Sequence, residues 1–472
     1  MTTGRDISFF FSPATIALVG ASPTPGKPSH VILESLKRIG YPGALYPVNP
    51  KYSAIDGLKC YSSLTEINRD IDVAIFALPA PTVIVIMERT DNVKGAIIVS
   101  AGFKETGAAG TKLEAELKEI GERKGIRIIG PNCMGIYDTV SQVDTFFTPE
   151  GRVRRPKRGV LSILTQSGSF AELIMDEMAS EGIGVARIVS YGNRVDVGET
   201  DCLNFLTDDA ATKVVAIYME SVDDGRRFVE VASRCTKKKP VVAVKVGKRE
   251  AGIHAARSHT GAISGRYEIY RAAFKKAGIV EVNGYEGLKD ACKVLNTYDL
   301  VEGNRVLIVT DGGGVGVSMA DACEDFGLTV SELSEETRKR LSAKLLGFSA
   351  TGNPIDLTGS VTDEDYVTAL KEGLQDDFDI VIITVLWGAP EITEELTDRL
   401  KEVRDSYNKP LLICTPNSEF TRRMAQRFEE NGMPVFFTPE SAARAAAVLA
   451  SGPLAVSLAR KNEERRSAKA RT

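Results

Sequence analysis

The residue of this sequence best suited to chemistry is His259, one of only three histidines among 472 residues. It belongs to a loop over residues 247–265 (GKREAGIHAARSHTGAISG), between an apolar strand expected over residues 241–246 and a helix expected to begin near Ser264 or Tyr267. Loops at strand ends carry many ligand-binding and catalytic residues of α/β proteins. A neutral imidazole is a nucleophile or a general base near neutral pH. An isolated loop histidine is also a common packing or surface residue, and that alternative stays open.

The neighbouring residues narrow the chemistry open to this histidine. The sequence has no G-x-S-x-G motif for acyl hydrolysis. Its seven cysteines form no C-x-x-C pair, and His254 is the only other histidine nearby, so the sequence predicts no metal site. The role that remains is a covalent group carrier, with phosphate as the cargo if the chain also offers anion-binding turns.

Two glycine-rich turns, each after an expected strand and before an expected helix, supply such sites. They are Gln166-Ser167-Gly168, after a strand over residues 159–164, and Gly312-Gly313-Gly314, after a strand over residues 305–310. A helix N-terminus offers about half a positive charge and unpaired N–H groups to a phosphoryl group. Two such helix ends, facing each other, would hold a phosphohistidine without a buried lysine or a metal ion.

A carboxylate is available to orient the histidine. The apolar strand expected over residues 216–220 ends in Glu220. If Glu220 accepts a hydrogen bond from one ring nitrogen of His259, the other nitrogen is left free to attack. A strand-end glutamate that faces water is the alternative.

The chain opens with a strand over residues 15–19, a turn from Gly20 to Lys27 that includes Ser22, and a helix over residues 29–39. This is a Rossmann-like opening that offers a phosphate site. The G-x-G-x-x-G fingerprint is absent, and no acidic residue closes the second strand. Lys51 in Asn49-Pro50-Lys51 suits a phosphorylated nucleotide better than NAD, with a solvated turn lysine as the alternative.

Strands and helices alternate along the whole chain, which predicts an α/β protein with parallel, doubly wound sheets. A basic connector over residues 152–158 suggests a boundary. We therefore expect an α/β domain over residues 1–150, a second over 151–298, a third over 299–455 and a polar, disordered tail over 456–472.

Composition excludes several classes of protein. A net charge of −4 gives no electrostatic reason to expect nucleic acid or a membrane surface as partner. No run of about 18 apolar residues and no signal-peptide pattern is present. The odd number of scattered cysteines favours free thiols in the cytoplasm.

Ten motifs in order resemble the α subunit of the ADP-forming acyl-CoA synthetases, a branch of the succinyl-CoA synthetase superfamily. They are VGAS, YPVNPKY, SAGFKETG, GPNCMG, TQSGSF, YGNRVDV, YMES, SHTGAISG, TDGGGVG and NPIDLTG. The resemblance covers roughly residues 8–449. It implies a Rossmann-like CoA-binding domain followed by two flavodoxin-like CoA-ligase domains.

The resemblance also implies roles for individual residues. His259 would be the phosphorylated histidine, Glu220 its supporting carboxylate, and Gln166-Ser167-Gly168 and Gly312-Gly313-Gly314 the two phosphate-binding loops. The CoA site would be formed by Gly20, Ser22, Lys27, Asn49, Lys51, Pro131 and Asn132, with the last two near the pantetheine end. Two residues depart from the family pattern: Asp311 places a negative charge beside a phosphate loop, and His30 replaces a glycine-rich continuation.

The implied reaction is the reversible conversion of acyl-CoA, ADP and phosphate to free acid, ATP and CoA. The family also needs an ATP-grasp module, for which the sequence shows no lysine-rich nucleotide site or carboxylate set. We therefore expect a separate β subunit that binds ADP or ATP with Mg²⁺, in an αβ or α2β2 assembly. The sequence does not identify the acyl group. Four aromatic residues either shape the acyl pocket or belong to the core: Phe103, Phe146, Phe147 and Tyr191.

Two other classes of function are weighed against this one. A CoA-binding regulatory module without phosphotransfer would keep the glycine turns but would not need His259 or Glu220. A nicotinamide dehydrogenase would explain the opening strand, turn and helix, but the missing fingerprint argues against it.

Overall fold

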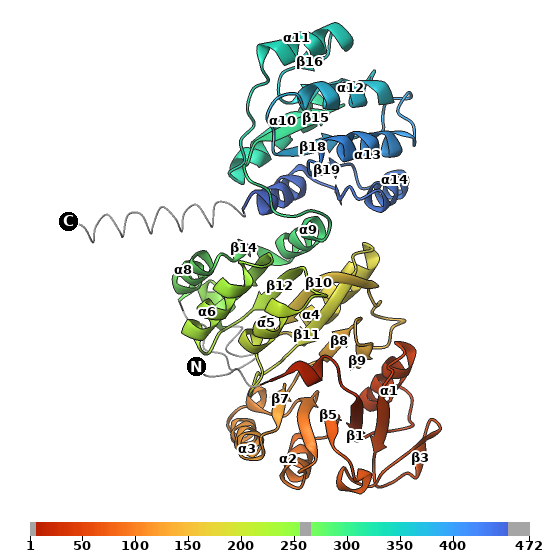
Figure 1. Ribbon diagram of the computed structural model, residues 1–472, viewed down its shortest axis with the longest axis vertical. Coiled ribbons are helices and arrows are strands. Elements are labelled where there is room, and N and C mark those ends of the chain that lie inside the picture. The colour runs from red at the N-terminus through yellow and green to blue at the C-terminus, as the bar shows by residue number, and fades with distance from the viewer. Residues whose placement is uncertain (1–5, 255–265, 452–472) are drawn as a thin grey trace, which may run out of the picture. The chain divides into compact units, whose positions relative to one another are not determined.

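The computed structural model describes residues 6–254 and 266–451 (Figure 1). The chain divides into two compact units, Met1–Gly284 and Tyr285–Thr472. His259 and the tail expected over residues 456–472 lie outside the described residues, so the expectations that concern them stay predictions.

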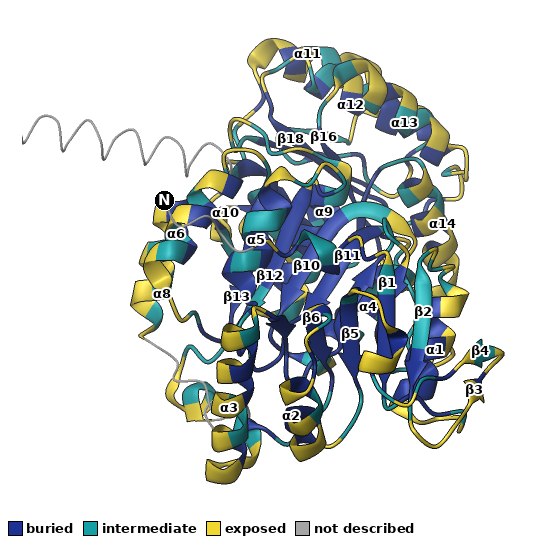
Figure 2. Cartoon of the chain, turned by 60° about the horizontal axis from the view of Figure 1, so that its bottom comes forward, coloured by how far each residue is buried: buried dark blue, intermediate teal, exposed yellow. Residues whose placement is uncertain are grey.

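The first unit opens with a parallel five-stranded sheet in the order β2-β1-β5-β6-β7. Its strands are β1 (Thr15–Val19), β2 (Ala44–Val48), β5 (Ile71–Phe76), β6 (Val93–Ile98) and β7 (Arg127–Ile129), with helices α1 (Pro28–Arg38), α2 (Ala80–Glu88) and α3 (Ala108–Lys124) between them and a small hairpin of β3 (Ala54–Ile55) and β4 (Leu58–Lys59). The central strands are buried while the helices expose one face (Figure 2). Helices that cover both faces of a parallel sheet explain why its strands are almost wholly apolar.

A second sheet of seven strands follows in the same unit, in the order β14-β13-β12-β10-β11-β8-β9. Its strands are β8 (Gly135–Asp138), β9 (Val143–Asp144), β10 (Arg158–Thr165), β11 (Val185–Ser190), β12 (Val214–Met219), β13 (Val241–Lys245) and β14 (Val280–Val282), and its helices are α4 (Gly168–Ser180), α5 (Glu199–Asp208), α6 (Gly225–Cys235) and α8 (Tyr267–Ala277). Strands β10 to β14 are parallel, whereas β8 pairs antiparallel with β11 and β9. The chain thus enters the second sheet at Gly135, ahead of the basic connector over residues 152–158.

The two sheets of the first unit share one apolar core. It includes Ile75 and Ile97 of the first sheet and Val189 and Ile217 of the second. Phe11, from the cluster ahead of β1, stacks on Phe205 of α5 with 4.1 Å between ring centroids. Because stacked aromatic rings bury large areas, this N-terminal cluster helps to join the two sheets.

The second unit holds a six-stranded sheet in the order β16-β17-β15-β18-β19-β20. Its strands are β15 (Val306–Thr310), β16 (Ala350–Thr351), β17 (Ile355–Asp356), β18 (Ile380–Thr384), β19 (Leu411–Cys414) and β20 (Val435–Phe436), and its helices are α9 (Gly284–Thr297), α10 (Gly313–Asp325), α11 (Glu335–Lys344), α12 (Asp363–Gly373), α13 (Leu396–Tyr407) and α14 (Glu419–Glu430). Helical residues 439–451 close the described part of the chain, and Arg444 there forms an ion pair with Asp290 of α9 at 2.7 Å. All strands except β16 run parallel to their neighbours.

Two further properties of the described residues bear on function. All seven cysteines are buried and free. Within the described ranges no helix is both long and apolar enough to cross a lipid bilayer.

Candidate functional site

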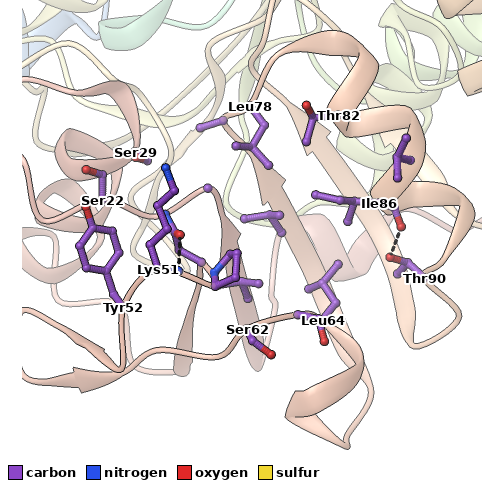
Figure 3. Close-up of a pocket in the computed structure, with 18 of the residues that line it drawn as sticks. Ser22, Ser29, Lys51, Tyr52, Ser62, Leu64, Leu78, Thr82, Ile86 and Thr90 are labelled. Atoms are coloured by element: carbon purple, nitrogen blue, oxygen red, sulfur yellow. Dashed lines mark hydrogen bonds between the residues drawn. The ribbon is translucent and has the colours of Figure 1, made fainter.

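A cavity of about 730 Å³ opens at the carboxyl edge of the first sheet (Figure 3). It collects five of the residues predicted to bind CoA: Gly20, Ser22, Lys27, Asn49 and Lys51. Polar side chains such as Ser22 and Lys51 lie on one side, and Leu64, Leu78 and Ile86 lie on the other. Cavities of this size with an apolar wall and a few polar groups are typical of sites for small organic ligands.

Local backbone geometry forms the floor of this cavity. Gly20 has a φ of +87°, and a Cβ atom there would lie 2.7 Å from the Cγ atom of Leu78, so only glycine fits. Asn49 donates from Nδ2 to the carbonyl of Ala21 at 2.7 Å and accepts the N–H of Lys51 at 3.0 Å. The Asn49 side chain therefore joins the two turns, while the exposed ammonium groups of Lys27 and Lys51 can meet an anionic ligand.

Pro131 and Asn132 lie elsewhere on the same sheet edge, after β7, and are not among the residues that line this cavity. Asn132 adopts a left-handed backbone with a φ of +55° and donates its N–H to the carbonyl of Ser100 at 3.0 Å. A Cβ atom at Gly168 would lie 3.3 Å from the Cγ atom of Met134. The loop over residues 130–134 thus adjoins the Gln166-Ser167-Gly168 turn of the second sheet.

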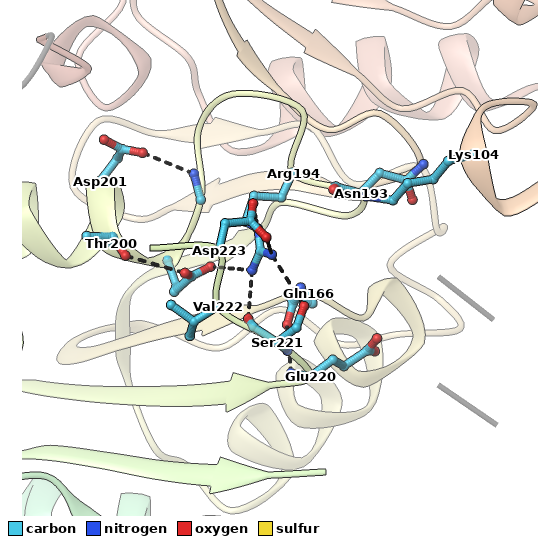
Figure 4. A network of polar contacts seen from close by, with 12 residues as sticks. Lys104, Gln166, Asn193, Arg194, Thr200, Asp201, Glu220, Ser221, Val222 and Asp223 are labelled. Carbon is cyan, nitrogen blue, oxygen red and sulfur yellow. Dashed lines mark hydrogen bonds and ion pairs between the residues drawn. The ribbon is translucent and has the colours of Figure 1, made fainter. Parts of the chain in front are cut away.

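The Gln166-Ser167-Gly168 turn and Glu220 meet at the carboxyl edge of the second sheet (Figure 4). The Oε1 atom of Gln166 accepts the N–H of Glu220 at 2.6 Å and that of Ser221 at 2.8 Å. Ser167 caps α4, since its Oγ atom accepts the N–H of Phe170 at 3.2 Å. The structure therefore places Glu220 beside the N-terminus of α4, whereas the predicted contact of Glu220 with His259 lies outside the described residues.

Lys245 is a charged residue of this edge that the sequence analysis missed. It ends β13, pairs in register with Met219 of β12, and is only 1% exposed. Burial lowers the pKa of its ammonium group to about 8, while the charge of Glu220 acts in the opposite direction. The arrangement in which two helix ends hold a phosphohistidine without a buried lysine stays a prediction. The sequence signal for Lys245 was the single lysine in the apolar run VVAVKV.

The second predicted phosphate turn lies in the second unit. Gly312 precedes α10 and Gly313 and Gly314 form its first turn. Asp311 is directed away from this turn, because its carboxylate oxygens accept the N–H of Leu386 at 3.0 and 3.1 Å. Burial raises the pKa of Asp311. The Asp311 side chain thus accepts a hydrogen bond from the end of the neighbouring strand, at a position where burial disfavours its charged form.

Other residues singled out in the sequence belong to the packing of the chain. Phe103, Phe146 and Tyr191 are fully buried, and Phe147 packs partly buried against the core. His30 is buried on α1, with its Nε2 atom 3.5 Å from Glu34. Within the described ranges no group of three or more His, Cys, Asp or Glu residues could hold a metal ion.

Three family descriptions match consecutive parts of the chain. A CoA binding domain matches residues 14–139, a succinyl-CoA ligase like flavodoxin domain matches residues 158–295, and a ligase-CoA domain matches residues 306–451. These matches and the mostly parallel sheets give a Rossmann-like CoA-binding domain followed by two flavodoxin-like ligase domains.

Relatives match this chain over nearly its whole length. The α subunit of acetate–CoA ligase (ADP-forming) II of Pyrococcus furiosus is 37% identical over 452 residues, which cover 94% of this chain and 97% of that subunit. Acetate–CoA ligase (ADP-forming) I of Archaeoglobus fulgidus is 37% identical over 93% of this chain, which spans only 62% of that relative. A solved structure of dinucleotide forming acetyl-coenzyme A synthetase 1 from Ca. Korarchaeum cryptofilum, in complex with phosphate and ADP, matches with 31% identity and a TM-score of 0.89, over 97% of this chain and 99% of that one.

The three matched domains place the chain among proteins with a CoA-binding domain followed by succinyl-CoA ligase like domains. Within that class, the chain belongs to the ADP-forming acetate–CoA ligase family and matches one of its named α subunits over almost the whole length of that subunit.

Proposed function

We propose that this chain is the α subunit of an ADP-forming acyl-CoA synthetase, which reversibly converts acyl-CoA, ADP and phosphate to free acid, ATP and CoA. The observation that carries the proposal is the convergence of Gln166, Ser167 and Glu220 at one sheet edge, in the same unit as the cavity with Lys27 and Lys51. Family membership over nearly the whole chain supports the same activity.

The reaction then runs in three steps. Phosphate attacks the thioester carbon of acyl-CoA, and CoA leaves with a proton as an acyl phosphate forms. A ring nitrogen of His259 attacks the phosphorus atom, and the carboxylate leaves as free acid. Phosphohistidine finally transfers its phosphoryl group to ADP. In this scheme the CoA-binding residues are Gly20, Ser22, Lys27, Asn49, Lys51, Pro131 and Asn132, and the phosphate loops are Gln166-Ser167-Gly168 and Gly312-Gly313-Gly314.

Glu220 supports the second step by holding one ring nitrogen of His259 as a hydrogen-bond donor. The helix N-terminus at Ser167 offers N–H groups to the phosphoryl oxygens. Lys245 adds positive charge at the same edge, where little water screens it.

We propose acetate as the preferred acyl group, since relatives at 37% identity are named for acetate. Relatives named for 4-hydroxybutyrate and for trans-feruloyl groups match at 27% and 30% identity, so family membership alone does not fix the acyl group. We further propose that a separate ATP-grasp β subunit binds ADP and Mg²⁺ in an αβ or α2β2 assembly. The match to a named α subunit supports that partner, and the free cysteines fit a cytoplasmic location.

The test is formation of a phosphoenzyme. The purified chain, with and without its candidate β subunit, is incubated with radiolabelled phosphate and acetyl-CoA or other acyl-CoAs. We expect an acid-labile, base-stable label that disappears in the His259→Ala variant and persists in the His254→Ala variant, whose histidine is exposed on the same segment. Full acetyl-CoA-dependent turnover in His259→Ala would contradict the proposal. Tight CoA binding without any phosphoenzyme would support the regulatory module instead.

A further inference from the structure

The segment that follows β11, residues 191–197, runs along the loop after β7. Two of its N–H groups donate to carbonyls of that loop, Asn193 to Pro131 at 2.9 Å and Val195 to Gly130 at 3.0 Å, and a third, that of Val197, donates to Ile128 of β7 at 2.9 Å. The two backbones approach so closely that a Cβ atom at Gly192 would lie 2.3 Å from the carbonyl oxygens of Pro131 and Asn132. The segment and the predicted pantetheine-end loop are therefore one packed structure.

The side chain of Asn193 extends this contact to α3. Its Oδ1 atom accepts from Nδ2 of Asn132 at 3.4 Å, and its own Nδ2 atom donates to Glu105 at 2.6 Å and to Glu114 at 2.7 Å. Lys104 donates to the carbonyl of Asn193 at 2.5 Å. Both polar ends of the Asn193 side chain are thus engaged, and one of them meets Asn132.

The next residue, Arg194, turns the other way, toward Ser221 and Asp223 in the loop after β12 (Figure 4). Its Nη1 atom donates to the carbonyl of Ser221 at 2.7 Å and to Glu199 at 2.9 Å. Its Nε and Nη2 atoms contact the carboxylate of Asp223 at 3.2 and 2.5 Å. A planar guanidinium with several fixed donors can hold carbonyl and carboxylate groups at once, which an ammonium cannot do with the same geometry.

The Glu220-Ser221 peptides are consequently held from two sides. Gln166 accepts both N–H groups, and Arg194 donates to the carbonyl that follows them. The next N–H group, that of Val222, donates to the hydroxyl of Tyr270 at 3.2 Å. The backbone that carries the Glu220 side chain therefore has little freedom to shift.

Arg194 occupies this position on a left-handed backbone, with a φ of +59°. That conformation is uncommon for a residue with a Cβ atom and costs free energy. Gly198 leaves room for the side chain, since a Cβ atom there would lie 2.4 Å from Cδ of Arg194. Burial lowers the pKa of Arg194, but Glu199 and Asp223 outweigh that effect and raise it overall, so the guanidinium stays charged.

We propose that the dipeptide Asn193-Arg194 is a positioning element: Asn193 fixes Asn132 at the thioester end of the CoA site, and Arg194 fixes the backbone that aims Glu220. The inference rests on the proposed function and adds to it two residues that touch neither the substrate nor the reacting atoms. One rigid turn thereby sets the distance between the place where acyl phosphate forms and the carboxylate that serves the next step.

The two residues are expected to affect different kinetic constants in the full chain assayed with its β subunit. Arg194→Met is expected to lower kcat at least tenfold while KM for acetyl-CoA stays within threefold. Arg194→Lys keeps the positive charge but lacks the planar guanidinium with its several donors, so its kcat should lie between those of Arg194→Met and wild type. Asn193→Ala is expected to raise KM for acetyl-CoA at least fivefold with a smaller change in kcat.

Arg155→Met is the matched control. Arg155 has the same side-chain exposure of 8% as Arg194, pairs with Asp144 at 2.9 Å and donates to the carbonyls of Val153 and Thr148. None of these partners belongs to the candidate site. The control should lose stability as Arg194→Met does while keeping kcat within twofold of wild type.

Hydrogen exchange gives a second readout that needs no activity. The amides over residues 219–224 should exchange at least fivefold faster in Arg194→Met than in wild type, and not in Arg155→Met. Unchanged exchange, unchanged kcat in Arg194→Met, or an equal loss of kcat in the control would each overturn the inference. Wild-type protein without acyl-CoA-dependent turnover would instead refute the proposed function, while the exchange comparison still decides the positioning of the Glu220 backbone.

Discussion

The turn after β10 and the turn after β15, one in each unit, have the same construction. In each, a threonine hydroxyl accepts the N–H and donates to the carbonyl of the residue two positions later: Thr165 with Ser167 at 3.0 Å, and Thr310 with Gly312 at 3.1 Å. In each, the next side chain, Gln166 or Asp311, accepts N–H groups from the end of the neighbouring strand. Each turn then begins a helix of 13 residues.

The two turns differ in what that neighbouring strand end carries. Thr165 pairs in register with Tyr218, and Thr310 with Thr384, so Glu220 in the first unit corresponds to Leu386 in the second. A carboxylate is thus available at one turn and an isobutyl group at the other. Under the proposed function, both helix ends would bind an anion, but only the first has a carboxylate that would orient a histidine.

The space behind the turns differs as well. In the first unit Phe170 stacks on Tyr218 with 4.1 Å between ring centroids. The corresponding residues of the second unit, Val315 and Thr384, are smaller and line a cavity of about 190 Å³ together with Leu386 and Cys414. Aromatic side chains therefore fill the space next to the first turn, whereas the equivalent space next to the second turn is a cavity.

The largest effect on activity is expected when the carboxylate of Glu220 is replaced. Glu220→Gln keeps the size of the side chain and removes its charge, so phosphoenzyme formation from acetyl-CoA and phosphate should slow by roughly 100-fold, the scale of a lost acid–base partner. Leu386→Gln, the equivalent change in the second unit, should leave the rate within about threefold. Equal losses in the two variants would show that the turns are not functionally distinct.

The second-largest effect is expected for Gln166 and Asp311, the turn residues whose side chains accept N–H groups from the neighbouring strand end. Gln166→Ala leaves the buried N–H groups of Glu220 and Ser221 without their acceptor, which should destabilise the first unit by about 2 kcal/mol. Asp311→Ala removes the acceptor of a single N–H group and should cost less. Urea denaturation followed by circular dichroism, with exchange of the β12 amides to assign the unit, measures both. A smaller loss for Gln166→Ala than for Asp311→Ala would contradict the comparison.

A smaller effect, of opposite sign, is expected for Asp311→Asn. Because burial raises the pKa of Asp311, its contribution to stability is fully present below the unfolded-state pKa and is lost as pH rises through the folded-state value. Asparagine can still accept the N–H of Leu386 and carries no charge to desolvate. At pH 7 the variant should melt roughly 2–4 °C higher, and the gain should vanish near pH 3.

The melting of this variant can be followed selectively. Trp387, the single tryptophan of the chain, lies in the second unit, so its fluorescence reports on that unit. A gain that persists unchanged at pH 3 would mean that the charge of Asp311 is not its cause.

The smallest effect on stability is predicted for Thr384, which lines the cavity of the second unit. The hydroxyl of Thr384 is buried and, among the described residues, has no hydrogen-bond partner. Thr384→Val replaces it with a methyl group of the same size and should stabilise the second unit by about 0.5–1 kcal/mol. Trp387 fluorescence in urea measures the change. A loss of stability would show that the hydroxyl is hydrogen-bonded to water in the cavity.

Much of the fold was predictable because buried strands are runs of branched and apolar residues. The strand expected over residues 15–19 is β1 itself, and the one over residues 241–246 differs from β13 by a single residue. The hairpin of β8 and β9 was not predicted as part of the second sheet, since four- and two-residue strands carry almost no periodicity. Their place is decided by the antiparallel pairing of β8 with β11 and of β9 with β8, which sequence pattern does not encode.

The site was predictable where its residues are rare or stand in turns, and not where they act through long-range contacts. Glu220 and the glycine turns follow directly from strand ends in the sequence. Lys245 and Arg194 did not stand out, because lysine and arginine are common and usually solvated. Only the fold places Lys245 inside the sheet edge and brings Arg194 to the carbonyl of a residue 27 positions away.

The burial of all seven cysteines has a consequence for the proposed reaction, which releases a thiol at every forward turnover. Burial raises the pKa of Cys133, Cys292, Cys323 and Cys414 to about 12. At neutral pH only about one molecule in 10⁵ would carry a given thiol as thiolate, the form that attacks disulfides. Exchange of these four thiols with a disulfide of CoA is therefore expected to be slow, which keeps the chain from forming mixed disulfides with CoA at these positions.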